Sequence, residues 1–388
     1  MKLLSVFSVF LSSAFFFSCA LLVSHASEIQ EFDLGPIRIR NQFPISLRFL
    51  SMTPDTPVTL PEKTYSLSYQ MSISNTFINT RGESGDLVPG KVKSGLEKSD
   101  FIIEEIQQPR NGFNMYVDVE TYRHLFQVRC GLPFHAEIAL EWPLLSFEGG
   151  FMDHPIEQVH EFTGVSNATE DGGFREKSDR NRFDYYLIRN NRFIVRERKP
   201  FSLQVGDPVF TVKWHLYQER PFIPHIGLQL SYKYPWDGAD KYPRNLISSG
   251  RRDVGIYYLF AKSFFEKQWH LYLQGGKTLI NRKEKAFKNF QSHLLFALEY
   301  HGTPDRSWLI QLAHQSSIFP SHSPPLANTY REFVVDRGLG EPTDVLILGV
   351  KQFIFPFIYS FGFAEDINQT RNEIDFLVFF EVERNFKI

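Results

Sequence analysis

The segment TYSLSYQMSISNTFIN, Thr64 to Asn79, alternates large apolar side chains with small polar ones. The two sets are Tyr65, Leu67, Tyr69, Met71 and Ile73 against Ser66, Ser68, Gln70, Ser72 and Ser74. A period of two is typical of a β-strand with one apolar and one polar face. The segment exceeds the roughly 9 to 11 residues that a tilted strand needs to cross a membrane. It therefore predicts one wall strand of a membrane β-barrel, with its serine face toward the lumen.

Eleven further segments of similar character predict an all-β protein. With Thr64 to Asn79, the expected wall strands are 64–79, 113–130, 134–142, 210–217, 226–233, 252–263, 267–280, 289–301, 306–317, 343–354, 357–364 and 373–386. Some alternate poorly, 343–354 in particular. About twelve strands is an even number, as single-chain bacterial barrels require, so we predict a transmembrane antiparallel β-barrel.

The lengths of the connections support this prediction, because outer-membrane barrels alternate short periplasmic turns with long outer loops. The long connections are expected near 80–112, 144–208, 235–251, 281–288, 318–342 and 365–372, and the short ones near 131–133, 219–221, 264–266, 302–305 and Pro356. Long and short connections alternate, and both chain ends fall on the short-turn side. Residues 183–198 are expected to form an extra hairpin within an outer loop.

The first 26 residues have the pattern of a secretory signal peptide. Lys2 precedes an apolar run from Leu3 to Val23, and small residues at Ser24 and Ala26 provide a cleavage site. Residues 27–63 then form an N-terminal segment that contains IRIRNQFPI, an expected short strand. This segment is predicted either to enter the lumen as a plug or to lie along the periplasmic rim, and the barrel is predicted over 64–388.

These patterns together predict the outer membrane of a diderm bacterium as the location. The expected partners are outer-membrane lipid and lipopolysaccharide, the barrel assembly machinery, which the closing strand ending near Phe386 would contact, and a small solute. The formal net charge of −2 argues against a nucleic-acid partner. No later stretch approaches the roughly 18 uninterrupted apolar residues of a transmembrane helix.

Three short motifs resemble one known family. They are GPIRIRNQFP (Gly35 to Pro44), GGFMDHPIEQVHEFTG (Gly149 to Gly164) and FAEDIN (Phe363 to Asn368). The chain resembles the bacterial domain-of-unknown-function family numbered 3187, over most of its length after Gly35. The resemblance implies an outer-membrane barrel of unassigned activity and supplies no catalytic residues.

Strand parity predicts a lumen of mixed charge. The lumen-lining candidates are Ser66, Ser68, Gln70, Ser72, Asp118, Glu120, Glu137, Glu141, Lys213, His215, His270, His293, Glu299 and Asp375. Two interpretations stay open at this point: these side chains form a pathway or binding site for a polar solute, or they pair with one another inside a barrel whose interior is polar in any case.

One outer-loop motif has the residue types of a metal or acid–base site. Asp153, Glu157 and His160 would share one face of a short helix. A capped loop helix packed on the barrel explains them better, because a lone pair of ligands at that spacing is an incomplete site. The chain also lacks a G-x-S-x-G element. We therefore predict no enzyme, no catalytic residue, no metal and no cofactor.

The function predicted from the sequence is a passive or gated channel for a small solute. The first alternative is an envelope-structural or adhesive barrel that acts through its outer loops, above all 144–208. An outer-membrane hydrolase is a weaker alternative.

Overall fold

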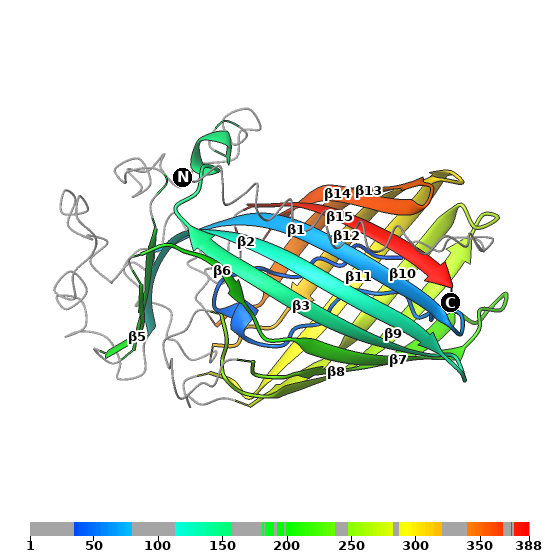
Figure 1. Cartoon of the computed structure of the whole chain (residues 1–388), viewed down its shortest axis with the longest axis horizontal. Coiled ribbons are helices and arrows are strands. Elements are labelled where there is room, and N and C mark those ends of the chain that lie inside the picture. Colours follow the sequence, from blue (N-terminus) through cyan, green and yellow to red (C-terminus); the bar gives the residue numbers. More distant parts are fainter. Residues whose placement is uncertain are drawn as a thin grey trace.

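The protein is a closed, twelve-stranded antiparallel β-barrel with almost no helix, as the sequence predicts (Figure 1). The computed structural model describes residues 35–79, 113–156, 158, 181, 183–189, 192–197, 199–236, 247–281, 287–319, 340–367, 374 and 376–387. The predicted signal peptide lies outside the described residues, as do Glu157, His160 and Asp375.

The wall strands follow one another around the barrel in chain order. They are β1 (Thr64–Asn79), β2 (Phe113–Leu132), β3 (Ala136–Glu148), β7 (Val209–Tyr217), β8 (His225–Lys233), β9 (Asp253–Phe264), β10 (Trp269–Ile280), β11 (Phe290–Thr303), β12 (Arg306–Gln315), β13 (Thr343–Ile354), β14 (Phe357–Asp366) and β15 (Phe376–Lys387). β1 pairs with β15 along its length, with Thr64 opposite Lys387, and this pairing closes the ring.

Three additional strands extend the wall at one end. β4 (Asp184–Arg189) pairs with the first part of β2, and β5 (Arg192–Glu197) pairs with β4. They form the hairpin expected at 183–198. β6 (Phe201–Val205) pairs with the last part of β3. We call this end of the barrel the long-loop end, and the opposite end, which carries the turns 133–135, 218–224, 265–268, 304–305 and 355–356, the short-turn end.

The outer face of the barrel is apolar. Along β9 and β11, exposed and covered residues alternate strictly over most of the strand. The exposed positions around the wall include Ile138, Phe210, Val254, Ile256, Tyr258, Leu273, Phe296, Ile310, Phe361, Val378 and Phe380. A band of large apolar side chains around a barrel is the surface that lipid chains cover. Among the described residues, no helix is long and apolar enough to span a bilayer.

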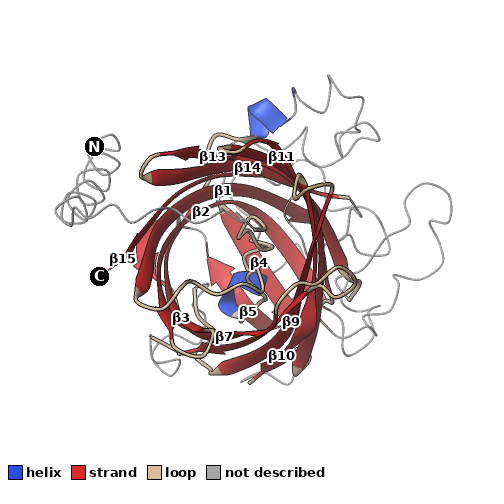
Figure 2. Cartoon of the chain, turned by 90° about the vertical axis from the view of Figure 1, so that its right-hand side faces the viewer, coloured by secondary structure: helices blue, strands red, loops and turns tan. Residues whose placement is uncertain are grey.

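Residues 35–60, which we call the inner segment, run inside the barrel. The Gly35 carbonyl accepts a hydrogen bond from Lys351 near the short-turn end of β13. The segment's one short helix, η1 (Ser46–Arg48), lies within the ring of strands (Figure 2). The chain then returns, and the Leu60 N–H donates to Glu137 near the short-turn end of β3. The inner segment thus passes through the lumen twice before β1 begins.

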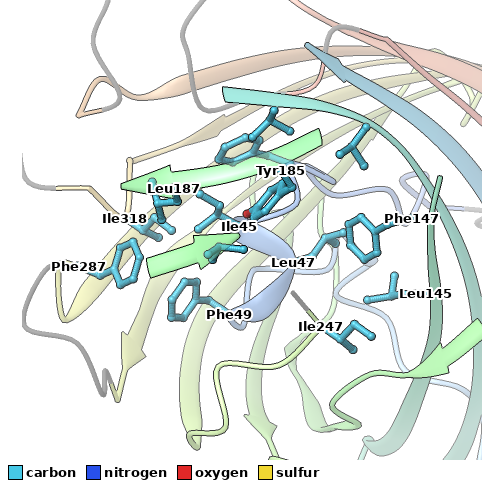
Figure 3. Packing of buried hydrophobic residues seen from close by; sticks show 14 of the residues in the cluster. Ile45, Leu47, Phe49, Leu145, Phe147, Tyr185, Leu187, Ile247, Phe287 and Ile318 are labelled. Carbon is cyan, nitrogen blue, oxygen red and sulfur yellow. The ribbon is translucent and has the colours of Figure 1, made fainter. Parts of the chain in front are cut away.

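The turning point of the inner segment is held by an apolar cluster at the long-loop end. Phe43, Ile45, Leu47 and Phe49 are buried there. Figure 3 shows the last three among their neighbours. Their partners come from the wall, from the β4–β5 hairpin and from residues that follow the wall strands: Val117, Val119, Leu145, Phe147, Phe183, Tyr185, Leu187, Val195, Ile247, Ile280, Phe287, Ile318 and Phe319. Burial of each of these four side chains stabilises the docked segment by about 1.5–3 kcal/mol before ordering costs.

The prediction of a strand at IRIRNQFPI is wrong. Residues 37–43 have no strand assignment. Their alternation has a different cause: Ile37 and Ile39 pack on an apolar patch of the inner wall, Leu309, Val345, Ile347, Ala364, Leu377 and Phe379. Arg38 points to carboxylates instead. The same patch explains why 343–354 alternates poorly, because β13 is apolar on both faces where it covers Ile37 and Ile39.

The predicted parity of β2 is also wrong. In the continuous register with β1, Arg129 lies opposite Ser66 and Arg123 opposite Ser72, so the odd-numbered residues of β2 share the inner face with the serines. Asp118 and Glu120 are therefore on the outer face and do not line the lumen. The prediction failed because Val117 and Val119 face inward, where the apolar turning point of the inner segment covers them.

Candidate functional site

The candidate site is the contact between the inner segment and the inner wall of the barrel. Its centre is Asp55, the carboxylate of the returning chain. The Lys213 ammonium of β7 lies 2.7 Å from Asp55, and the guanidinium groups of Arg38 and Arg129 lie 3.8 and 3.9 Å from it. Two of these three cations belong to the wall, so Asp55 ties the segment to the barrel.

The same cations hold carboxylates of the wall. Arg38 lies 2.7 Å from Glu383 and 3.5 Å from Glu381 on β15. Arg129 also contacts Glu383, and Glu137 of β3 lies 3.7 Å from Arg129 and 3.3 Å from Lys213. We call this set the charge cluster: Arg38, Asp55, Arg129, Glu137, Lys213, Glu381 and Glu383. Its members are largely buried, and such charges persist in a protein only when they are paired.

Two glutamines of the wall hold the backbone of the inner segment. The Gln311 amide on β12 accepts a hydrogen bond from the Ile37 N–H at 2.5 Å and donates to the Ile37 carbonyl at 3.2 Å. Gln274 on β10 accepts from the Asp55 N–H at 3.2 Å and donates to the Asp55 carbonyl. Each glutamine therefore pairs with the backbone N–H and the backbone carbonyl of one residue of the inner segment, as a neighbouring strand does in a β-sheet.

The serine face of β1 is covered by the inner segment. Gln42 donates to the Ser72 hydroxyl at 2.5 Å, and Gln70 donates to the Arg38 carbonyl at 3.5 Å. Ser66 donates to Glu383 at 2.9 Å. Ser68 is also buried. All four side chains are buried, and Gln70 and Ser72 contact the inner segment directly, so they do not line an open lumen in this conformation.

The remaining predicted lumen residues are spread over the inner wall. Glu137 and Lys213 belong to the charge cluster, and Glu141 is buried on the same face of β3 and accepts from Gln127. His215 lies 3.0 Å from His225 at the short-turn end. His293 contacts Thr278, and His270 contacts the Lys267 carbonyl. Glu299 accepts from Tyr272 and Ser307. These residues do not converge on one catalytic centre.

The outer-loop motif fixes the chain on the outer face. The Glu120 carboxylate accepts hydrogen bonds from the Phe151 N–H, at 2.6 Å, and from the Met152 N–H. Asp153 accepts from Asn75 of β1 and from the Asn181 N–H, both at 2.8 Å. Residues 153–156 form one helical turn. In the described part of the chain, no group of three His, Cys, Asp or Glu side chains is placed to hold a metal ion.

Sequence reasoning missed the residues that join the segment to the wall. Arg38, Asp55, Arg129, Gln274, Gln311 and Glu383 were not among the candidates. A correct parity for β2 would have placed Arg129 beside Ser66. Asp55 carries a weaker signal: it is the single carboxylate among residues 35–60, in a segment with three arginines.

A polar inner wall inside an apolar outer band defines an outer-membrane type of β-barrel. The chain belongs to the family described as a protein of unknown function (DUF3187), whose family model matches residues 111–386. No protein of curated function matches the sequence.

Among solved structures, the chain is similar to the COG4313 outer membrane channel from Pseudomonas putida F1. The TM-score is 0.51 at 12% identity, over 87% of this chain and 100% of that one. It is also similar to the NanC porin, with a TM-score of 0.37 at 8% identity over 69% and 94% of the two chains. A FadL homologue of Pseudomonas aeruginosa gives 0.32 at 9% identity over 89% and 92%. At these identities the similarity shows the fold alone.

Proposed function

We propose that this protein is a gated outer-membrane channel for small polar solutes, and that the inner segment is its gate. The observation that carries the proposal is that residues 35–60 fill the lumen through contacts made mainly with wall side chains. The segment has no backbone ladder with the barrel, so its departure leaves every wall strand paired with both neighbours.

The contacts in the middle of the lumen suit a segment that leaves and returns. Charges and glutamine amides that hold the segment are groups that water solvates well, so release replaces protein contacts with hydration. The wall part of the charge cluster also keeps internal partners, because Arg129 and Lys213 each retain Glu137. A vacated lumen would be polar and charged, which suits a polar solute.

The direction of opening follows from the topology. Both ends of the inner segment are at the short-turn end, which we assign to the periplasm because short turns lie there in barrels of this type. The turning point at the long-loop end is buried in the apolar cluster. The segment therefore leaves toward the periplasm, and its apolar turning point is the part that resists release.

Conductance across planar bilayers tests the proposal. The complete mature chain is compared with a version that lacks residues 35–60, and heat-dependent mobility in gels verifies that both barrels are folded. We expect rare openings from the complete chain and a sustained conductance from the shortened one. A folded, shortened barrel that does not conduct would contradict the channel and would favour a structural or adhesive role.

A further inference from the structure

We propose that Arg40 of the inner segment and Arg123 of β2 bind one small inorganic anion of the size of chloride, held between the segment and the wall. Both side chains are buried, with exposed fractions of 9% and 1%. Both line the same cavity, together with apolar side chains such as Leu145 and Val209. The structure thus places two guanidinium groups against one small space.

Neither guanidinium has the partners that a buried arginine needs. Arg40 donates one hydrogen bond, to the Ser51 hydroxyl at 3.4 Å, and Arg123 donates one, to Gln70 at 3.3 Å. The Nε atoms of both arginines are buried without a hydrogen-bond partner. Among the described residues, neither arginine has a carboxylate within 4.0 Å.

Two other arginines of the lumen, Arg38 and Arg129, differ from this pair in their ion pairs, although their Nε atoms also lack a hydrogen-bond partner. Arg38 and Arg129 each contact three carboxylates. Arg40 and Arg123 share only the more distant charge of Glu141, whose Oε2 atom itself has no hydrogen-bond partner. Arg123 also faces the charge of Glu381, a carboxylate that Arg38 holds at 3.5 Å. The two guanidinium groups therefore have no anionic acceptor in direct contact, and a small anion between them supplies one.

The other charged groups of the cavity are already engaged. Lys233 lies 3.1 Å from both Asp207 and Asp253. Asp207 also accepts from Ser248 at 2.7 Å and from the Trp236 N–H at 3.1 Å. Arg40 and Arg123 are therefore the cavity residues whose hydrogen-bond donors lack partners, and guanidinium N–H groups are good anion ligands.

The size of the cavity selects the ligand. It has room for about one sphere of the size of a water molecule. A halide ion is somewhat larger than a water molecule, so the arginine side chains must shift slightly to admit it, whereas a tetrahedral oxyanion is much larger. Because one arginine comes from the inner segment and the other from the wall, the site exists only while the segment is docked. A bound anion therefore stabilises the docked conformation.

Bromide locates the site directly, because it replaces chloride and scatters X-rays anomalously. Crystals of the complete mature chain grown in sodium bromide are expected to show an anomalous peak between Arg40 and Arg123, and Arg123→Gln is expected to lose it. Ordered water at that position, with no anomalous signal, would overturn the proposal.

Thermal unfolding in detergent provides a second measurement in solution. The unfolding midpoint is compared in sodium chloride and in sodium gluconate at equal ionic strength. We expect chloride to raise the midpoint of the wild type, and of Arg306→Gln, whose arginine is exposed at the start of β12, but not of Arg123→Gln. An equal chloride effect in all three proteins would also overturn the site. Neither measurement depends on conductance, so the anion site and the channel function are tested independently.

Discussion

Asp55→Asn is the substitution that best tests whether the inner segment is a gate that leaves the lumen or a plug that fills it permanently. It removes one negative charge that faces Lys213 at 2.7 Å and two guanidinium groups at 3.8 and 3.9 Å. Loss of one partner of a buried ion pair costs about 3–5 kcal/mol. We take the lower value, about 3 kcal/mol, because each of the three cations keeps a second carboxylate.

This cost falls on the docked conformation alone, because a released Asp55 is solvated and no longer faces the cations. At about 1.4 kcal/mol per tenfold change, 3 kcal/mol raises the ratio of released to docked segment on the order of 100-fold. The assay is the frequency of single-channel openings in planar bilayers, measured at fixed protein density and salt. Asp305→Asn, in an exposed turn away from the inner segment, is the matched control.

The reasoning would be refuted by an opening frequency for Asp55→Asn equal to that of the wild type and of Asp305→Asn. A double substitution adds a further check. In a cycle with Lys213→Met, the two effects should be less than additive, because the second substitution removes a cation that the first has already deprived of one of its two carboxylate partners.

Two other predictions follow from the packing of the lumen. In Gly227→Val, the new Cβ would lie 2.9 Å from the Pro57 Cα, so we expect the inner segment to be displaced and openings to become frequent. Gly302→Val, whose new Cβ has contacts of 3.6 Å or more, should conduct like the wild type. Equal conductance of the two variants would show that the segment does not rest on β8. Arg129→Gln removes a cation from the buried Glu137 and Glu383, each of which keeps one other cation, and should lower the urea stability of the folded barrel by about 3 kcal/mol, whereas Arg123→Gln, measured in the absence of halide, should change it by less than about 1 kcal/mol. Equal losses in these two variants would contradict the assigned difference in their pairing.

The wall of the barrel could be predicted from the sequence because lipid on one side and polar groups on the other impose a period of two. Thr64 to Asn79 shows that period without interruption, and the structure has a strand with those bounds. The alternation of long and short connections then supported a barrel with both chain ends on the short-turn side. The period of two and the connection lengths are both local in sequence, so they can be recognised without knowing what fills the barrel.

The interior could not be predicted in the same way, because its polarity depends on what fills it. Val117, Val119 and the patch around Ile347 face inward because the inner segment presents apolar side chains to them. A parity rule that sends apolar residues to lipid fails at these positions. The partners of Asp55 are 17 to 158 residues away in sequence, and only the closed ring brings Arg38 and Lys213 to it.

Ser72, on the serine face of β1, is the position for the most direct test. Its hydroxyl is covered by Gln42 of the inner segment and buried in the docked conformation. Ser72→Cys is made in a Cys130→Ser background, in the complete chain and in the version that lacks residues 35–60, and a charged thiol reagent is added during bilayer recording. We predict that the reagent reduces the current of the shortened barrel and modifies the complete chain, which opens only rarely, far more slowly. Equally rapid modification of both proteins, or modification of the shortened barrel that leaves its current unchanged, would contradict a lumen closed by the inner segment.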